Sequence, residues 1–146
     1  MSWFRAWLCI GCFILPALGM AESFEVRCFT SMENSGAPIN LKFSTMFVPS
    51  DKYRIGYVVY EKSKEPIPLY FSGESERVFE EGRPFEVTTK WREILKGEQG
   101  GEYTVISQGA IIYEFSYRSK SGKIFNFNYN SKATHTSQGG CNWGGV

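Results

Sequence analysis

The chain contains few of the residues from which enzyme active sites are built. Its 146 residues include one histidine, His135, and one aspartate, Asp51. No Gly-x-Ser-x-Gly motif holds a nucleophilic serine, no His/Cys cluster has zinc spacing, and the glycines of 97–101 are not followed by the Gly-Lys-Ser/Thr of a phosphate loop. Because catalysis needs a positioned base, nucleophile or metal, we expect a non-enzymatic protein without a cofactor.

The chain also lacks an excess of either charge. It has 16 Lys and Arg residues against 15 Asp and Glu residues. If a leader containing Arg5 is removed, the remaining chain carries no net charge. A balanced surface argues against nucleic acid or an anionic membrane as the partner.

The first 21 residues have the pattern of a cleaved signal peptide. Arg5 supplies a positive charge, residues 6–18 are apolar and broken only by Pro16, and Gly19-Met20-Ala21 offers small residues for the peptidase. The apolar run is shorter than the roughly 20 residues of a membrane helix. An uncleaved anchor and a lipid-anchored start at Cys12 are the alternatives.

This pattern divides the sequence into two parts. Residues 1–21 are expected to be the signal peptide, and residues 22–146 a single all-β domain with an irregular tail at 131–146. We therefore expect a periplasmic or secreted protein with no membrane span in the mature chain. The absence of an Asn-x-Ser/Thr sequon from that part fits a bacterial origin.

Cysteine is scarce once the leader is removed. Cys9 and Cys12 leave with it, so Cys28 and Cys141 remain near opposite ends of the mature chain. In an exported protein such a pair is expected to form a disulfide. A bridge over a loop this long stabilises by about 4 to 5 kcal/mol in the chain-entropy model. Two free thiols or an intermolecular bridge are the alternatives.

The most regular stretch of the sequence is 108–130. Two runs rich in aromatic and β-branched residues flank a short polar turn with Gly122, which is typical of a β-hairpin. In the second run Phe125, Phe127 and Tyr129 alternate with asparagines, so one face is expected to be buried and the other wet. We interpret this hairpin as the centre of an all-β domain.

Further segments have the same alternation and are separated by turn residues. Successive short hairpins predict a single antiparallel β-barrel or sandwich of about eight or nine strands. The abundance of Phe and Tyr favours a filled interior. A short helix over 91–96 is an alternative to a strand there. The expected strands are 24–30, 39–47, 53–61, 67–71, 85–89, 91–95, 103–107, 111–118 and 124–130.

The longest segment without a strand pattern is 72–84, and we expect it to be a loop that carries binding. Long loops on a rigid sheet are where function tends to lie, and Arg and Glu side chains offer charge-assisted hydrogen bonds to a partner. An ordinary surface loop is the alternative. The candidate binding residues are Ser72, Gly73, Glu74, Glu76, Arg77, Phe79 and Arg83.

Two other features bear on function. The asparagines 126, 128 and 130 are either the wet face of a strand or a platform for sugar hydroxyls. In Cys28, Cys141 and Ser72-Gly73 the chain resembles small exported β-barrels that inhibit lysozyme, which also carry a cysteine near each end and a Ser-Gly loop. The likeness is confined to these residues, so it assigns no family.

The expected function is therefore binding. A small, exported, neutral chain without a catalytic set suggests a protein that binds or inhibits another protein, such as a cell-wall hydrolase or a toxin, as a monomer or small homo-oligomer. The alternative is a β-barrel of the cell envelope that binds a lipid or a glycan, in its mouth or on the asparagine face.

Overall fold

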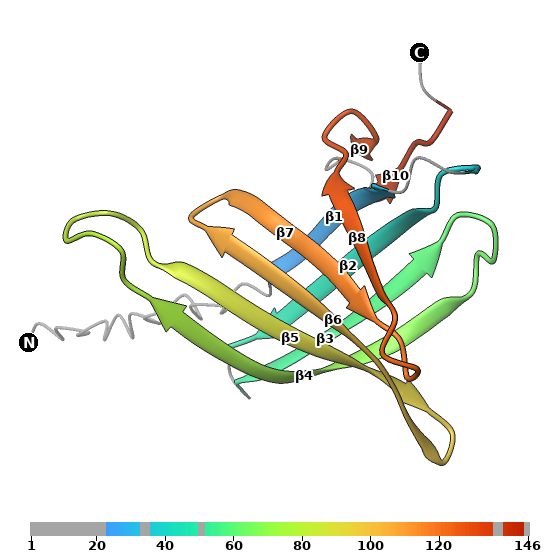
Figure 1. Cartoon of the computed structure of the whole chain (residues 1–146), viewed down its shortest axis with the longest axis horizontal. Coiled ribbons are helices and arrows are strands. Elements are labelled where there is room, and N and C mark those ends of the chain that lie inside the picture. The colour runs from blue at the N-terminus through green and yellow to red at the C-terminus, as the bar shows by residue number, and fades with distance from the viewer. Residues whose placement is uncertain (1–22, 33–35, 50–51, 136–138, 145–146) are drawn as a thin grey trace, which may run out of the picture.

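The structure is a computed structural model, and it describes residues 23–32, 36–49, 52–135 and 139–144. Within them the chain forms a closed antiparallel barrel of eight strands, in which each strand pairs with the next and β8 returns to β1 (Figure 1). Two short strands pair in the tail. The strands are β1 (Ser23–Ser31), β2 (Asn40–Val48), β3 (Tyr53–Tyr60), β4 (Pro66–Arg77), β5 (Glu86–Leu95), β6 (Glu98–Gln108), β7 (Ile111–Arg118), β8 (Ile124–Tyr129), β9 (Thr134–His135) and β10 (Gly140–Cys141).

The all-β prediction is confirmed, and of the two architectures left open the barrel is observed. The helix considered for 91–96 is wrong, because these residues continue β5 as far as Leu95. The chain then turns at Lys96-Gly97, where Gly97 has φ of 76°. This left-handed conformation favours glycine, and it allows β6 to pair back along β5.

The hairpin expected around Gly122 is also present. β7 and β8 pair from Phe115↔Phe127 to Arg118↔Ile124, and Gly122 has φ of 84° in the turn between them. The Ser119 amide donates to the Lys123 carbonyl at 2.9 Å. The hairpin is not the centre of the sheet, however; it is the part of the wall that closes the barrel against β1.

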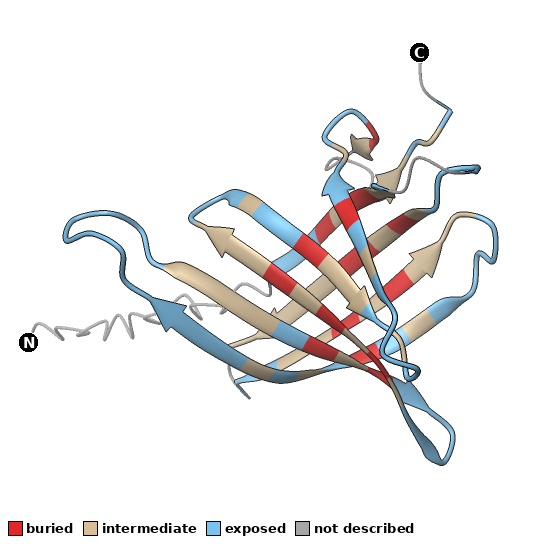
Figure 2. Cartoon of the chain, in the orientation of Figure 1, coloured by how far each residue is buried: buried red, intermediate tan, exposed pale blue. Residues whose placement is uncertain are grey.

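Aromatic rings fill the middle of the barrel. The rings of Phe29 and Phe115 stack with centroids 4.0 Å apart, and Trp91 meets Phe43 edge-on at 5.7 Å. Such pairs add to the apolar area that the core buries. Figure 2 shows the buried residues as bands across the strands, away from the β4–β5 connection.

The two ends of the barrel differ, and we name them by what they hold. The β3–β4, β5–β6 and β7–β8 connections lie at one end, called the closed end, which three tyrosines fill. The β4–β5 and β6–β7 connections lie at the opposite end, called the open end (Figure 1). β8 is the shortest strand of the barrel, so the wall is least complete toward the open end.

The tail is tied to the outside of β1. Cys28 and Cys141 form the expected disulfide, and the Asn142 amide donates to the Ala133 carbonyl at 2.8 Å. Cys28 is fully buried beneath this segment. Disulfides form and persist in oxidising compartments. The short β9–β10 pairing was not predicted from the sequence.

The predicted signal peptide lies outside the described residues. In the part of the chain that the structure describes, no helix is long and apolar enough to cross a membrane.

Candidate binding site at the open end

A cavity of about 600 Å³ opens at the open end of the barrel. Its floor is apolar and is formed by Phe43, Trp91 and Val105, which belong to three different strands and are nearly buried. Phe47 and Ile112 add apolar wall. The expectation of a filled interior is therefore wrong for this half of the barrel, because the large rings of the core gather in the middle and at the closed end.

Polar groups also line the cavity wall. The hydroxyls of Thr45, Thr89 and Ser107 lie among the apolar side chains. The Thr89 hydroxyl accepts a hydrogen bond from the Trp91 indole at 3.2 Å. Apolar walls with a few polar groups are the usual composition of a ligand-binding or side-chain-binding cavity.

Two arginine–glutamate pairs stand around the cavity. Arg27 pairs with Glu25 on β1, and its Nε donates to the carboxylate at 2.8 Å. Arg54 pairs with Glu74 across β3 and β4 and lies over the Phe71 ring, 4.7 Å from its centroid. The charges cancel in pairs, so these four groups do not select a partner of either net charge.

The open end also exposes large apolar side chains. Phe79 is 55% exposed and Ile111 is 60% exposed, although side chains of this size are usually buried. Large apolar side chains are also exposed elsewhere, for example Ile94 and Leu95 at the closed end, so those of the open end mark a candidate interaction surface only together with the cavity. The rim, as we call it below, consists of Phe24, Tyr53, Val78, Phe79, Phe85, Ile111 and Tyr113.

The structure corrects the extent of the predicted binding loop. Residues 72–77 are not loop: they are the outer half of β4 and pair with β5 as far as Arg77↔Glu86. The register shifts between Phe71 and Gly73, so Ser72-Gly73 forms a β-bulge rather than the base of a loop. Bulges bend a strand, and the alternating charged residues beyond this one give no signal of a buried strand, which is why the sequence suggested a loop.

The predicted binding residues lie along the outer part of one hairpin. Ser72 is exposed on the outside of the barrel and Gly73 is half-buried beside it. Glu74 reaches Arg54 at the cavity, whereas Glu76 is exposed farther along β4. The seven residues thus follow one ribbon and do not converge on one point.

The true loop spans 78–85, and every residue in it is exposed. The Arg77 guanidinium lies 4.4 Å from the centroid of the Phe79 ring, and Arg83 pairs with Glu80 at 2.7 Å. Phe79 therefore packs on a charged neighbour and leaves part of its ring to solvent. Figure 1 shows this loop at the tip of the β4–β5 hairpin, beyond the barrel wall.

The asparagine row is only partly free. Asn126 and Asn128 are exposed on β8. The Asn130 side chain, however, donates to the Thr30 hydroxyl at 3.1 Å and accepts from the Ala133 amide at 3.1 Å. Asn130 therefore anchors the tail and is not part of an open platform for sugars.

The structure gives little information on the aspartate and the histidine. Asp51 lies outside the described residues, and His135 is described only as part of β9. Within the described ranges, no three His, Cys, Asp or Glu side chains are grouped so that they could hold a metal ion.

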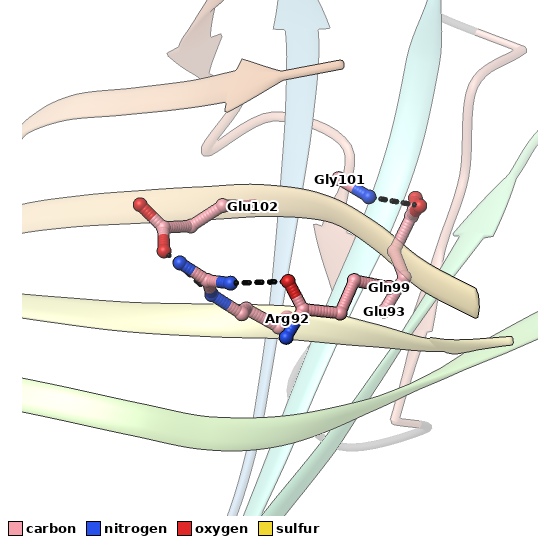
Figure 3. Close-up of polar contacts among 5 residues, drawn as sticks. All are labelled: Arg92, Glu93, Gln99, Gly101 and Glu102. Atoms are coloured by element: carbon pink, nitrogen blue, oxygen red, sulfur yellow. Dashed lines mark hydrogen bonds and ion pairs between the residues drawn. The ribbon is translucent and has the colours of Figure 1, made fainter. Parts of the chain in front are cut away.

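A buried carboxylate organises the closed end. Glu93 is only 7% exposed, and its Oε2 accepts from the Gly101 amide at 2.8 Å (Figure 3). The hydroxyls of Tyr103 and Tyr117 also donate to this carboxylate, at 3.2 and 3.3 Å. The Tyr60 hydroxyl lies 2.9 Å from that of Tyr103 and extends the network. Buried polar groups need such partners.

At the closed end there is no room for a side chain at Gly100 or Gly101 of β6. A Cβ on Gly101 would lie 2.3 Å from the Tyr117 ring, and one on Gly100 would lie 2.3 Å from the Glu93 Cβ. On the outer face, Arg92 joins β5 to β6 by contacts with Gln99 and Glu102 (Figure 3). This close approach of β5, β6 and β7 narrows the barrel interior at the closed end.

Burial changes the acidity of the three tyrosines. It raises the pKa of Tyr103 far above its ordinary value, and the neighbouring Tyr60 and Glu93 raise it further. Burial first and Glu93 second raise the pKa of Tyr117 to about 12. The pKa of Tyr60 is raised by burial, against a smaller lowering by its bond to Tyr103. All three hydroxyls stay protonated at neutral pH and can donate.

The sequence prediction missed the residues that line the cavity. Alternation along β1 places Glu25 and Arg27 on the same face as Phe29, and alternation along β3 places Arg54 on the face of Val58. Phe29 and Val58 are fully buried, so charges in phase with them face the interior. This placement of charged residues on the same strand face as buried apolar residues is the sequence signal from which the charged residues of the cavity could have been found.

Comparison of the chain with protein-family models, with curated proteins and with solved structures gives no match.

Proposed function

We propose that this protein is a non-enzymatic binding protein of an oxidising, extracytoplasmic compartment, periplasmic or secreted, and that it engages another protein at its open end. One observation carries the proposal: an open cavity with an apolar floor lies at the same end of the barrel as the exposed apolar side chains of the rim. The fully buried centre of a protein interface is apolar in the same way as this cavity floor. The Cys28–Cys141 disulfide supports the compartment.

The cavity and rim suit the capture of a projecting element of the partner. An aromatic or aliphatic side chain that enters the cavity would lose its contact with water against Phe43 and Trp91, which is the environment of an interface hot spot. At the edge of the cavity, the side chains of the Arg–Glu pairs can separate and pair with charged groups of the partner protein instead. We propose a hydrolase or toxin that is inhibited when its projecting element is held in this way.

The test compares two variants of the exported protein as bait in an extract of the source organism's envelope. Phe79→Asp with Ile111→Asp places charges on the rim, and Ile94→Asp with Leu95→Asp places the same charges on exposed closed-end residues. The proposal expects a partner protein that the parent and the closed-end variant retain and the rim variant loses at least tenfold. Equal recovery by both variants would place binding elsewhere.

A second candidate is a small ligand, a lipid or a glycan, held in the same cavity. The volume of about 600 Å³ lies within the range of roughly 300 to 1,000 Å³ that is usual for ligand sites. A solvent-sensitive naphthylamine dye tests this candidate. Dye fluorescence that rises on mixing, and falls when Val105→Arg fills the cavity, would show that a small apolar ligand can enter; displacement of the dye by a lipid or a glycan would favour this candidate over the protein partner.

A further inference from the structure

The barrel wall has a seam at the open end, between β1 and β7. β8 pairs with β7 only from Phe115 to Arg118 and with β1 only over Phe29 to Ser31. Among the described residues, no strand pairs with the seam side of β1 from Ser23 to Arg27. A second cavity of about 240 Å³ occupies this position. It is lined by four consecutive residues of β1, 24–27, by Ala110 and Ile112, and by Tyr129 of β8 and Gly139 of the tail.

The backbone of β1 directs hydrogen-bonding groups into this seam. The Cys28 carbonyl accepts from the Asn130 amide at 2.7 Å, and the Met32 amide donates to the Asn126 carbonyl at 2.9 Å. Alternate residues of an antiparallel strand direct their N–H and C=O groups to the same side. Phe24 and Val26, in phase with Cys28, therefore present two amides and two carbonyls to the seam.

The seam and the main cavity are continuous. Phe24, Glu25, Arg27 and Ile112 line both. A strand added in the seam would alternate its side chains between solvent and the barrel interior. Its inward side chains would enter the main cavity above Phe43, while its backbone would pair with Phe24 and Val26.

We propose that the seam binds an extended segment of the partner protein, which adds a strand to β1 and places alternate apolar side chains in the main cavity. This proposal rests on the proposed function and gives its mode of recognition, since added strands obtain affinity from main-chain bonds and specificity from pockets for alternate side chains.

The length of the free edge favours a segment over a second copy of the barrel. Four residues of strand extend over only about 13 Å at roughly 3.3 Å per residue. Two rigid barrels that met at such an edge would bury far less than the roughly 1,200 Å² of a stable interface. A narrow extended segment, in contrast, fits between β1 and the β6–β7 turn.

Hydrogen exchange of the free protein is the first test. The amides of Phe24 and Val26 should exchange much faster than those of Glu25 and Arg27, which face β2 in the same strand. If Val26 is as slow as Arg27, the protein's own chain already covers the edge and the proposal is wrong. Protection that grows with protein concentration would indicate a second copy and would also overturn it.

Binding of random linear peptides displayed on phage is the second test. Peptides enriched on the mature protein should carry apolar residues at alternate positions and should slow the exchange of Phe24 and Val26. Phe24→Pro removes an amide that faces the seam, whereas Phe24→Ala removes the same ring and keeps the amide. Proline is tolerated at such an edge, and circular dichroism would confirm that both variants fold.

The expected result is at least tenfold weaker peptide binding to Phe24→Pro than to Phe24→Ala. Equal binding to both variants, protection away from β1, or no enriched peptide would overturn the proposal. The two proposals can be told apart: a natural partner that needs the rim but binds both Phe24 variants equally would overturn the seam proposal and leave the proposed function, binding at the open end, standing.

Discussion

At the scale of single residues, Glu93 is the group on which the closed end depends most. It lies among aromatic rings and yet accepts from a backbone amide and two tyrosine hydroxyls. A buried acceptor with all its donors in place costs little, but its removal leaves several donors without a partner. The closed end is therefore stable only when Glu93 and all of its hydrogen-bond donors are present.

We predict that Glu93→Leu lowers the free energy of unfolding by about 3 kcal/mol or more, because the Gly101 amide and the tyrosine hydroxyls lose their acceptor in a buried site. Glu93→Gln keeps an acceptor oxygen and a similar shape, so it should cost clearly less. Urea unfolding at neutral pH measures both. Equal losses for Leu and Gln would show that the negative charge, rather than the set of hydrogen bonds, is what matters.

The tyrosines predict a loss of stability at high pH. In the unfolded chain a tyrosine loses its proton near pH 10, whereas folding raises the pKa of Tyr117 to about 12. The folded state thus binds more protons between these values, so stability is fully present below pH 10 and falls as pH rises toward 12. Burial raises the pKa of Tyr103 still further, which extends the loss.

Urea unfolding midpoints from pH 8 to pH 12 check this expectation. The parent should lose stability steadily above pH 10, and Tyr117→Phe should lose it less steeply because one titrating group is gone. A midpoint that does not change over this range would contradict the buried tyrosine network.

At the scale of elements, the strands could be predicted from alternation, but the places where they are bent could not. β8 shows the limit: Phe127 is buried as the pattern predicts, whereas Tyr129 is 44% exposed because the wall beside it is incomplete. On β1 the outward Cys28 is buried by a tail more than 100 residues away. The alternation within one segment does not show which residues a segment distant in the sequence will bury.

The candidate site was predictable only in part, for a related reason. The tip of the β4–β5 hairpin could be found because a long polar segment predicts an exposed connection, and Phe79 and Arg83 lie there. The cavity could not be found, because it depends on how far β8 extends and on which rings occupy the middle of the barrel. Both are properties of the closed wall rather than of any one segment.

We predict that the β4–β5 loop is dispensable for folding and required for binding. Arg77 and Glu86 are register partners, so a two-residue Asn-Gly turn can replace 78–85. Because all eight residues are exposed, stability should change by less than about 1 kcal/mol. Recovery of the partner protein should fall at least tenfold.

The matched control is at the closed end. Arg118 and Ile124 are register partners as well, so Asn-Gly can replace 119–123 in the same way. This variant should fold and retain the partner. Loss of the partner in the control, with retention in the 78–85 variant, would place the interface at the wrong end of the barrel.

At the scale of the whole molecule, the barrel is asymmetric along its axis. The closed end is sealed by Tyr60, Tyr103 and Tyr117 around a buried carboxylate, and the disulfide fixes the tail against the outside of β1. The open end holds the cavity, the rim, the seam and the exposed loop together. A rigid base that carries one adaptable end is a common plan for binding proteins.

The most direct measurement of the central claim is the hydrogen-exchange footprint of the partner on this protein. In the complex, exchange should slow in 23–27, 78–85 and 109–114, which surround the open end, and should stay unchanged in 61–65, 96–97 and 119–123 at the closed end. A footprint confined to the closed-end connections, or to the outer face of β8 at Asn126 and Asn128, would contradict the assignment of binding to the open end.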